Sequence, residues 1–431
     1  GILYILIFNL FNYSIFDGYD ADAHIAYVDF IAMYLPYELK LPLPINSYEY
    51  FSPPLPYLFP ALIQVICRNL ATSPDLVEYC QPIYGKATQI FQTVLYLLTL
   101  IFYMKALKIL LKQKSTFNLS FLLIFSLITV NYRTFLMLRG EPYIAFLLSV
   151  LVYLFIKNNE LSWKITKKQI FLFSFVVGFI GISRQWGLLL LPAFLLVLFF
   201  LQKELKKDYF KFMFIVFLIS MTIILPFYLN LYLTTGSVTS FNKDPQEFNL
   251  NNQSLSFYLP INDEAINTFR KPIRSNMDNQ LFPILYSDLW GDYWGYFSFI
   301  SKNVEKGRNQ INIGDYLARV NILSIFTTFI FFLGYINIKK NYKNNIVFRY
   351  IKYSILFTFF GYMWFLIKYP EIPTGDTIKA TYILQLFHLL AFSAAIYLEK
   401  LKDKSKKNYM IIISILIIIF THNFSAMLSH F

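Results

Sequence analysis

Residues 409–420 read Tyr-Met-Ile-Ile-Ile-Ser-Ile-Leu-Ile-Ile-Ile-Phe, and no side chain in this run carries a charge. With its flanks, the apolar segment covers 409–427, which is long enough to cross a bilayer as a helix. Similar runs occur along the whole chain of 431 residues, of which 57% are hydrophobic and 20% aromatic. This composition is too apolar for a soluble globular protein, so we expect a polytopic membrane protein.

Ten apolar runs precede this one, and the first of them, 1–12, is too short to span a membrane alone. We expect it to be the outer end of a helix that begins before Gly1. The others lie near 87–108, 116–132, 142–157, 169–183, 187–202, 212–233, 317–338, 351–368 and 381–398. The sequence therefore predicts an all-α bundle of about eleven transmembrane helices, forming one domain over 1–431.

The basic residues set the expected orientation of these spans. The net charge is +13, and most of the lysines and arginines fall in short runs within 105–114, 157–168, 203–211, 339–352 and 400–407. With eleven spans, all five runs lie on one side, which is the cytoplasm by the positive-inside rule. No recognition motif accompanies the charge, so nucleic-acid binding is excluded. Abundant Lys, Asn, Ile and Phe suggest a bacterial source and a plasma-membrane location.

Two segments on the opposite side, 13–86 and 234–316, are too long to be simple connections. Apolar residues in 25–35 recur at helical spacing, which predicts a helix lying in the membrane plane, and 55–65 could form a second one. Cys67 and Cys80 lie in the first outer segment. They could form a disulfide, although two separate thiols are favoured, and no Cys/His cluster has the spacing of a metal site.

An acidic motif, Asp17-Gly18-Tyr19-Asp20-Ala21-Asp22-Ala23-His24, follows the first apolar run. Carboxylates beside a bilayer are costly, which favours a functional role. Asp20 and His24 share one helix face at i,i+4 spacing. Two ordinary interpretations stand beside this one: a solvated membrane-proximal surface for the acids, and a hydrogen-bonded structural role for His24.

Four later motifs fall on the same predicted outer side. They are Arg139-Gly140-Glu141-Pro142, Ser183-Arg184-Gln185-Trp186, the stretch from Tyr286 to Gly295, and the stretch from Gly375 to Tyr382. Independent loops that bring acids and bases to one face are typical of an outward-facing catalytic cavity. Each motif also has an ordinary interpretation, as an interfacial ion pair, a snorkelling cation or an aromatic belt.

The acidic motif with its histidine, followed by the segment Glu49-Tyr50-Phe51-Ser52-Pro53-Pro54, resembles the first outer loop of GT-C glycosyltransferases that use lipid-linked donors. This superfamily includes protein mannosyltransferases and the aminoarabinose transferase of lipid A. Trp290-Gly291-Asp292-Tyr293-Trp294-Gly295 and Lys379-Ala380-Thr381-Tyr382-Ile383-Leu384 are similar to later elements of some members. The resemblance covers nearly the whole chain, through short and degenerate motifs.

The resemblance implies transfer of a sugar from a polyprenyl-phosphate donor to a lipid, glycan or protein acceptor at the outer membrane face. Asp20 would be the general base, or Asp22 if the acidic motif aligns differently with that of the family, and His24 would lie beside it. Inversion at the anomeric carbon would follow from a single displacement. The family often has adjacent Asp-Glu where this chain has Asp-Ala-Asp.

Chemistry assigns the remaining roles. The leaving phosphate needs cations, for which we expect Arg184, Lys379 and Arg139. The sugar or acceptor needs aromatic and acidic partners, for which we expect Glu141, Asp288, Trp290, Asp292, Tyr293 and Trp294. No cofactor is required and no metal-ligand set is predicted, although Asp20 and Asp22 could hold Mg²⁺ or Mn²⁺.

Two other functions use similar features. A transporter or flippase for a charged or lipid-linked solute would also carry ionisable groups in a membrane protein, but such groups usually lie at mid-span, between symmetric halves. A ligase or polymerase of the O-antigen type would share the donor class. The polar groups of this chain gather at span ends on one side, which favours the transferase.

Overall fold

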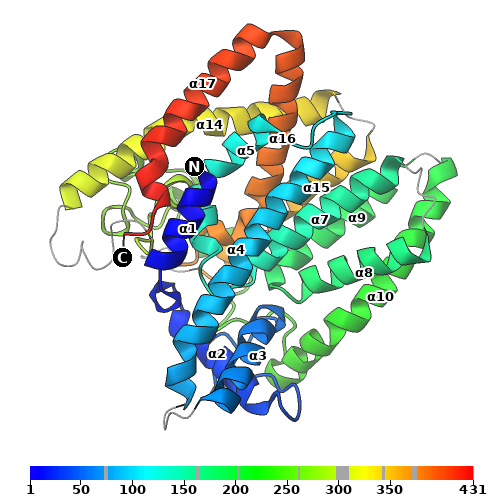
Figure 1. The fold of residues 1–431 in the computed structure, drawn as a ribbon, viewed down its shortest axis with the longest axis vertical. Coiled ribbons are helices and arrows are strands. Elements are labelled where there is room, and N and C mark those ends of the chain that lie inside the picture. Colours follow the sequence, from blue (N-terminus) through cyan, green and yellow to red (C-terminus); the bar gives the residue numbers. More distant parts are fainter. Residues whose placement is uncertain are drawn as a thin grey trace. The chain divides into compact units, whose positions relative to one another are not determined.

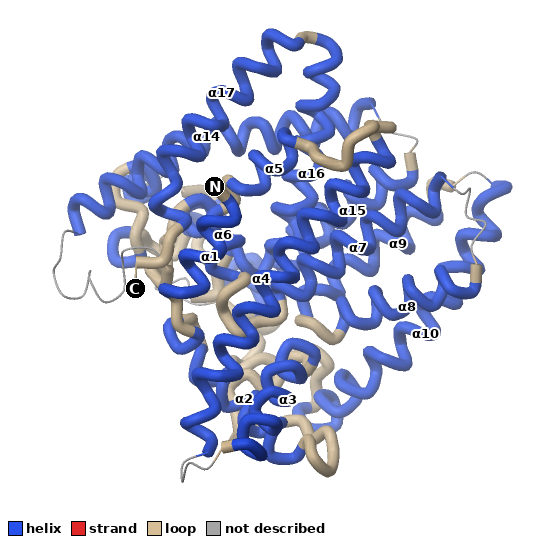
Figure 2. The backbone as a smooth tube through the Cα atoms, viewed as in Figure 1, coloured by secondary structure: helices blue, strands red, loops and turns tan. Residues whose placement is uncertain are grey.

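A computed structural model describes residues 1–71, 76–160, 166–201, 203–260, 263–297, 310–341, 345–370 and 376–430. Across these ranges every regular element is a helix and no strand is found (Figure 1; Figure 2). The chain divides into two compact units. Unit 1 comprises Gly1–Tyr13, Leu111–Thr134 and Asp244–Phe431, and unit 2 comprises Ser14–Leu110 and Phe135–Lys243. The prediction of a single domain stays a prediction, and each unit is described by itself.

Unit 2 contains the segment that carries the acidic motif. Its helices are α2 (Ala21–Tyr34), α3 (Leu55–Leu70), α4 (Leu76–Leu110), α7 (Glu141–Glu160), α8 (Lys167–Gly181), α9 (Leu191–Leu198) and α10 (Lys203–Thr235), with 3-10 turns η1 (Ile15–Asp17) and η2 (Gln185–Leu190). Helix α4 packs against α3 and α7, and α8 lies beside α10 (Figure 1). Helices α8 and α10 come close at Gly181, because a Cβ atom there would lie 2.6 Å from Cδ1 of Ile224.

Unit 1 is built around α16. Its helices are α1 (Ile2–Asn12), α5 (Leu119–Ser126), α6 (Thr129–Thr134), α11 (Leu255–Tyr258), α12 (Leu281–Trp290), α14 (Gln310–Asn341), α15 (Ile346–Lys368), α16 (Leu384–Lys404) and α17 (Lys406–Asn423). Its 3-10 turns are η3 (Leu250–Asn252), η4 (Asp263–Phe269), η5 (Arg274–Asn276), η6 (Ala380–Ile383) and η7 (Phe424–Met427). Helix α16 contacts α5, α14, α15 and α17. The crossing with α14 is close, because a Cβ atom on Gly334 would lie 2.5 Å from the backbone nitrogen of Ala394.

Within the described ranges, 7 helices are long and apolar enough to cross a membrane, and each coincides with a predicted span. They are Val77–Leu110, Glu141–Asn159, Lys206–Thr235, Ile313–Lys340, Ile346–Lys368, Ala380–Lys404 and Lys406–Met427. The other four predicted spans form shorter helices. The segment at 116–132 is interrupted between α5 and α6, and the carbonyl of Ser126 at the end of α5 accepts a hydrogen bond from the Tyr132 hydroxyl at 3.0 Å. The segment at 187–202 is divided into η2 and α9, and Pro192 occupies the first turn of α9, where proline is tolerated.

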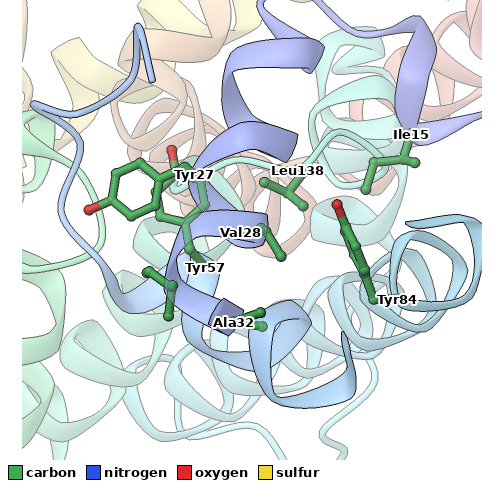
Figure 3. Close-up of a cluster of buried hydrophobic side chains, with 9 residues drawn as sticks. Ile15, Tyr27, Val28, Ala32, Tyr57, Tyr84 and Leu138 are labelled. Carbon is green, nitrogen blue, oxygen red and sulfur yellow. The ribbon is translucent and has the colours of Figure 1, made fainter. Parts of the chain in front are cut away.

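The two helices predicted in the first outer segment are present as α2 and α3. Tyr27, Val28 and Ala32 of α2 belong to one buried cluster with Tyr57 of α3 and Tyr84 of α4 (Figure 3). The rings of Tyr27 and Tyr57 stack with their centroids 3.9 Å apart. This apolar contact fixes α2 on α3.

The structure corrects the expectation of two separate thiols, because Cys67 and Cys80 form a disulfide. Cys67 lies near the end of α3 and Cys80 near the start of α4. Helices α3 and α4 pack against each other, so their ends bring the two residues to a Cα–Cα distance of 5.9 Å. The spacing of the two cysteines in the sequence does not by itself predict that they lie close together.

Candidate active site

Asp20 lies at the start of α2, as its N-cap residue, in an unusual backbone conformation. Its φ angle is 57°, in the left-handed region that residues other than glycine seldom adopt. Aspartate tolerates this region better than most side chains, yet such a conformation costs free energy and is found often at functional sites. The conformation turns the chain into α2, so that Asp20, Asp22 and His24 follow one another over the first turn.

A pocket of 420 Å³ opens beside this turn in unit 2. Its polar lining includes Asp20, Asp22, Ser47, Glu49 and Asn242. The side chain of Asp20 is 46% exposed, and Asp22 is exposed too. Ser47 closes one wall because its hydroxyl donates to the carbonyl of Ala23 at 2.7 Å. The pocket therefore offers two accessible carboxylates to a polar ligand.

Behind the pocket, Glu49 forms an ion pair with Arg184. An Nη1–H of Arg184 donates to Oε2 of Glu49 at 2.6 Å, and the two side chains are 5% and 6% exposed. Ser52 donates its hydroxyl proton to the same carboxylate and accepts from Arg184. On the other side, Nε of Arg184 lies 3.5 Å from Oε1 of Glu141, which is also buried. One guanidinium is thus held between two carboxylates.

Burial and the neighbouring charges together set the protonation of Glu49 and His24. Burial alone would raise the pKa of Glu49, but the charges of Arg184 and His24 and the hydrogen bonds from Arg184 and Ser52 together outweigh it and hold the pKa well below its usual range. Burial lowers the pKa of His24 to about 4, although the negative charge of Glu49 acts in the opposite direction. At neutral pH the site contains an ionised Glu49 and a neutral His24. The imidazole Nε2 lies 3.8 Å from Glu49, and Nδ1 lies 2.7 Å from the Tyr57 hydroxyl.

Arg139 is the second buried cation of unit 2. Its Nη2 lies 3.8 Å from Oδ2 of Asp20, and its guanidinium lies 4.4 Å from the centroid of the Tyr19 ring. The next residue must be glycine, because a Cβ atom on Gly140 would lie 2.1 Å from the carbonyl oxygen of Ser183. The close approach of these two backbones places Arg139 and Glu141 beside Arg184. The predicted motifs at 139–142 and 183–186 are therefore neighbours.

In unit 1, Asp288 and Asp292 are buried and share Arg133. Arg133 donates to Oδ1 of both carboxylates, at 2.5 Å in the case of Asp292. Backbone N–H groups complete the arrangement: Ala380 donates to Asp288 at 2.6 Å and Phe297 donates to Asp292 at 2.8 Å. Burial raises the pKa of Asp288, while Arg133 acts against this shift. The cluster joins α6, α12 and η6.

The aromatic residues predicted to bind a sugar differ in their surroundings. Trp290 and Tyr293 are fully buried, and Trp290 packs on Phe331 of α14. Trp294 instead has cations near its ring: Nζ of Lys379 lies 5.4 Å from the ring centroid and the guanidinium of Arg274 lies 4.7 Å from it. Its indole N–H donates to the carbonyl of Ile378 at 3.1 Å, which fixes the ring.

The predicted residues thus fall into two sets. Asp20, Asp22, His24, Arg139, Glu141 and Arg184 gather in unit 2, and Asp288, Trp290, Asp292, Tyr293, Trp294 and Lys379 gather in unit 1. The sequence interpretation missed two partners: Glu49, which pairs with Arg184 in unit 2, and Arg133, which pairs with Asp288 and Asp292 in unit 1. A cation at the edge of the apolar run 116–132 was a usable signal for Arg133. Glu49 gave no comparable signal, because its partners come from distant segments.

A metal role for Asp20 and Asp22 remains a prediction. Across the described residues no group of three or more His, Cys, Asp or Glu side chains is arranged to hold a metal ion.

A comparison with solved structures identifies the fold. The chain is similar to ArnT from Cupriavidus metallidurans, whose crystal structure was determined with bound undecaprenyl phosphate, at a TM-score of 0.51 and 11% sequence identity. The match covers 95% of this chain and 60% of the ArnT chain. This protein therefore shares its fold with that ArnT structure, and its described residues include 7 helices long and apolar enough to cross a membrane. Comparisons with models of protein families and with curated proteins gave no match.

Proposed function

We propose that the protein is a membrane glycosyltransferase that moves a sugar from a polyprenyl-phosphate donor to an acceptor. The observation that carries this proposal is the pocket beside Asp20 and Asp22, which presents accessible carboxylates at the position where the GT-C resemblance expects the base. The GT-C-like fold supports the same reaction class, and the ArnT structure holds a lipid of the proposed donor type.

In the proposed reaction a carboxylate accepts the proton of an acceptor hydroxyl while the acceptor oxygen bonds to the anomeric carbon. The bond between that carbon and the donor phosphate breaks, and the polyprenyl phosphate leaves. A general base commonly contributes about 10²–10⁴-fold to the rate. A single displacement of this kind inverts the anomeric centre.

Asp20 is the better candidate for the base. Both Asp20 and Asp22 line the pocket, but only Asp20 combines a left-handed backbone with a nearby cation, Arg139 at 3.8 Å. An ion pair at this distance orients the carboxylate without burying it. We assign Asp22 to acceptor binding in the same pocket.

Cations must neutralise the leaving phosphate. Arg184 already contacts Glu49 and Glu141, so a phosphate would have to compete with two carboxylates for it. Arg139, whose Nη2 lies 3.8 Å from Oδ2 of the proposed base Asp20, is our candidate in unit 2. The expected role of Lys379, which lies near the ring of Trp294 in unit 1, stays a prediction.

The outer membrane face is the proposed location of this chemistry. The disulfide between Cys67 and Cys80 lies in the same outer segment as Asp20, and disulfides persist in oxidising compartments. The lysine-rich ends of the spans fit the cytoplasmic side. A transporter is not favoured, since the accessible carboxylates lie at the start of a short helix outside the seven candidate spans.

The test uses purified protein in lipid nanodiscs with a panel of polyprenyl-phosphate sugars and a lipid-rich acceptor extract. Release of polyprenyl phosphate, measured by mass spectrometry, reports bond cleavage without knowledge of the acceptor. We expect release from at least one donor and a loss of at least about 100-fold in the double variant Asp20→Asn/Asp22→Asn. Equal release by the parent protein and the double variant would show that neither Asp20 nor Asp22 is the general base.

A further inference from the structure

Asp29 is a carboxylate that the proposed reaction does not use, and it joins α2 to two other helices of unit 2. Its Oδ1 atom accepts hydrogen bonds from Gln64 Nε2 at 2.6 Å and from the Tyr84 hydroxyl at 3.2 Å. Its Oδ2 atom accepts from Gln81 Nε2 at 2.8 Å. Gln64 belongs to α3, whereas Gln81 and Tyr84 belong to α4. Donors from two helices thus occupy both oxygens of one side chain.

The disulfide lies next to these donors. Cys67 follows Gln64 by three residues, which is nearly one helical turn, and Cys80 directly precedes Gln81. The covalent bond therefore holds α3 and α4 together beside the two amides that Asp29 contacts. Asp29 receives its hydrogen bonds from a fixed pair of helices.

Placing a carboxylate here carries a cost. Burial raises the pKa of Asp29, and the hydrogen bonds from Gln81, Gln64 and Tyr84, with the charge of Arg68, only partly oppose this shift. An apolar residue would avoid that cost. Hydrogen bonds, however, require defined distances and angles, whereas apolar packing tolerates small rotations. The carboxylate of Asp29 therefore fixes the orientation of α2, whereas the buried apolar cluster of Figure 3 stabilises its packing.

Orientation matters because Asp20 and Asp22 lie at the other end of the same helix. Asp22 precedes Asp29 by seven residues, which is about 10 Å along the axis. A rotation of α2 by about 20° would move a carboxylate at its surface by about 2 Å. A displacement of about 1 Å can cost about 100-fold in rate. A small rotation of α2 after loss of the hydrogen bonds to Asp29 would therefore displace the general base.

We infer that Asp29 is a positioning residue: bonded to Gln64, Gln81 and Tyr84 on the disulfide-linked pair α3 and α4, it sets the rotation of α2 and so the place of the general base. This inference rests on the proposed function. It assigns Asp29 no contact with substrate. It predicts that loss of the hydrogen bonds between Asp29 and the helices α3 and α4 lowers the rate of the chemical step and leaves donor binding nearly unchanged.

The test compares Asp29→Asn, Gln81→Leu and their combination with the parent protein in nanodiscs. Asparagine keeps the shape but replaces one acceptor oxygen by an amide that faces the donors. We expect kcat to fall about tenfold or more in each single variant, with KM for the donor within about twofold. The double variant should lose no more than the worse single variant, because both changes break one interaction. Glu38→Gln, at an exposed carboxylate just beyond α2, is the control and should retain the parent's kcat.

A second readout is independent of activity. Hydrogen exchange of the backbone amides of 21–34 should accelerate in Asp29→Asn and stay unchanged in Glu38→Gln. If the parent protein transfers no sugar, the proposed function fails, while the exchange rates still test whether the hydrogen bonds of Asp29 hold α2 in place. If the parent is active and Asp29→Asn keeps its kcat, or if α2 exchange is unchanged, the inference is overturned. Should Asp29→Asn fail to fold, Gln81→Leu and Gln64→Leu carry the same expectations and the same contrary outcomes.

Discussion

Arg184 and Glu49 form an ion pair with an N–O distance of 2.6 Å in which both side chains are buried. The residues are far apart in the sequence, and the pair joins the segment after α2 to the turn before η2. Glu141 approaches the same guanidinium to 3.5 Å. Because charges of this kind are costly to desolvate, each of them depends on its partners for stability.

Removing one member of the pair should therefore destabilise the protein. Glu49→Gln removes the nearer of the two carboxylates that contact Arg184, and we expect a loss of about 3–5 kcal/mol in the free energy of unfolding. Thermal unfolding in detergent would measure it. The triple variant Glu49→Leu/Glu141→Leu/Arg184→Met, which removes the cation together with both carboxylates that it contacts, should be more stable than Glu49→Gln. The reverse order would contradict the argument.

The buried Arg133 gives a parallel prediction in unit 1. Arg133→Gln leaves Asp288 and Asp292 without their shared cation, so we expect a similar loss of stability. Asp292→Asn should also lower the thermal midpoint, since Arg133 and the backbone N–H of Phe297 bond different oxygens of Asp292 and the amide keeps only one acceptor oxygen for them. If Asp292→Asn instead raised KM for the donor sugar at unchanged stability, the carboxylate would belong to sugar binding.

His24 predicts a pH dependence of stability. Its pKa lies at about 4 in the folded protein and near 6.5 in an unperturbed histidine, so the unfolded state binds more protons between these two pH values. Stability should therefore fall as the pH is lowered from 6.5 towards 4, by about 3 kcal/mol in total. Unfolding measured across this range should show the slope in the parent protein and a much smaller one in His24→Gln. A slope that persists unchanged in the variant would assign it to another group.

The disulfide predicts a dependence on reductant. Cys67 and Cys80 close a short loop with a sequence separation of 13, for which the chain-entropy model gives about 3 kcal/mol. The double variant Cys67→Ser/Cys80→Ser should unfold at a lower temperature, and reductant should lower the midpoint of the parent but not of the variant. Labelling of both cysteines by a maleimide in the unreduced, denatured protein would contradict the bond.

The sequence predicted the helical architecture and the neighbourhood of the acidic motif, because apolar runs and helical spacing are local properties. It also singled out Arg139, Glu141 and Arg184, which the fold brings together within unit 2. What it could not predict were pairings between distant segments: Glu49 with Arg184, Arg133 with Asp288, and Cys67 with Cys80. Interruptions of an apolar run, such as that between α5 and α6, leave little trace in composition.

The release of polyprenyl phosphate from a lipid-linked sugar donor tests the proposed reaction most directly. It should be measured for the parent protein, Asp20→Asn, Asp22→Asn and the exposed control Glu38→Gln in the same nanodiscs. We predict release by the parent and the control, a loss of about 100-fold or more in Asp20→Asn, and a smaller loss in Asp22→Asn. Release by Asp20→Asn at the parent's rate, or no release from any donor by the parent, would contradict the account.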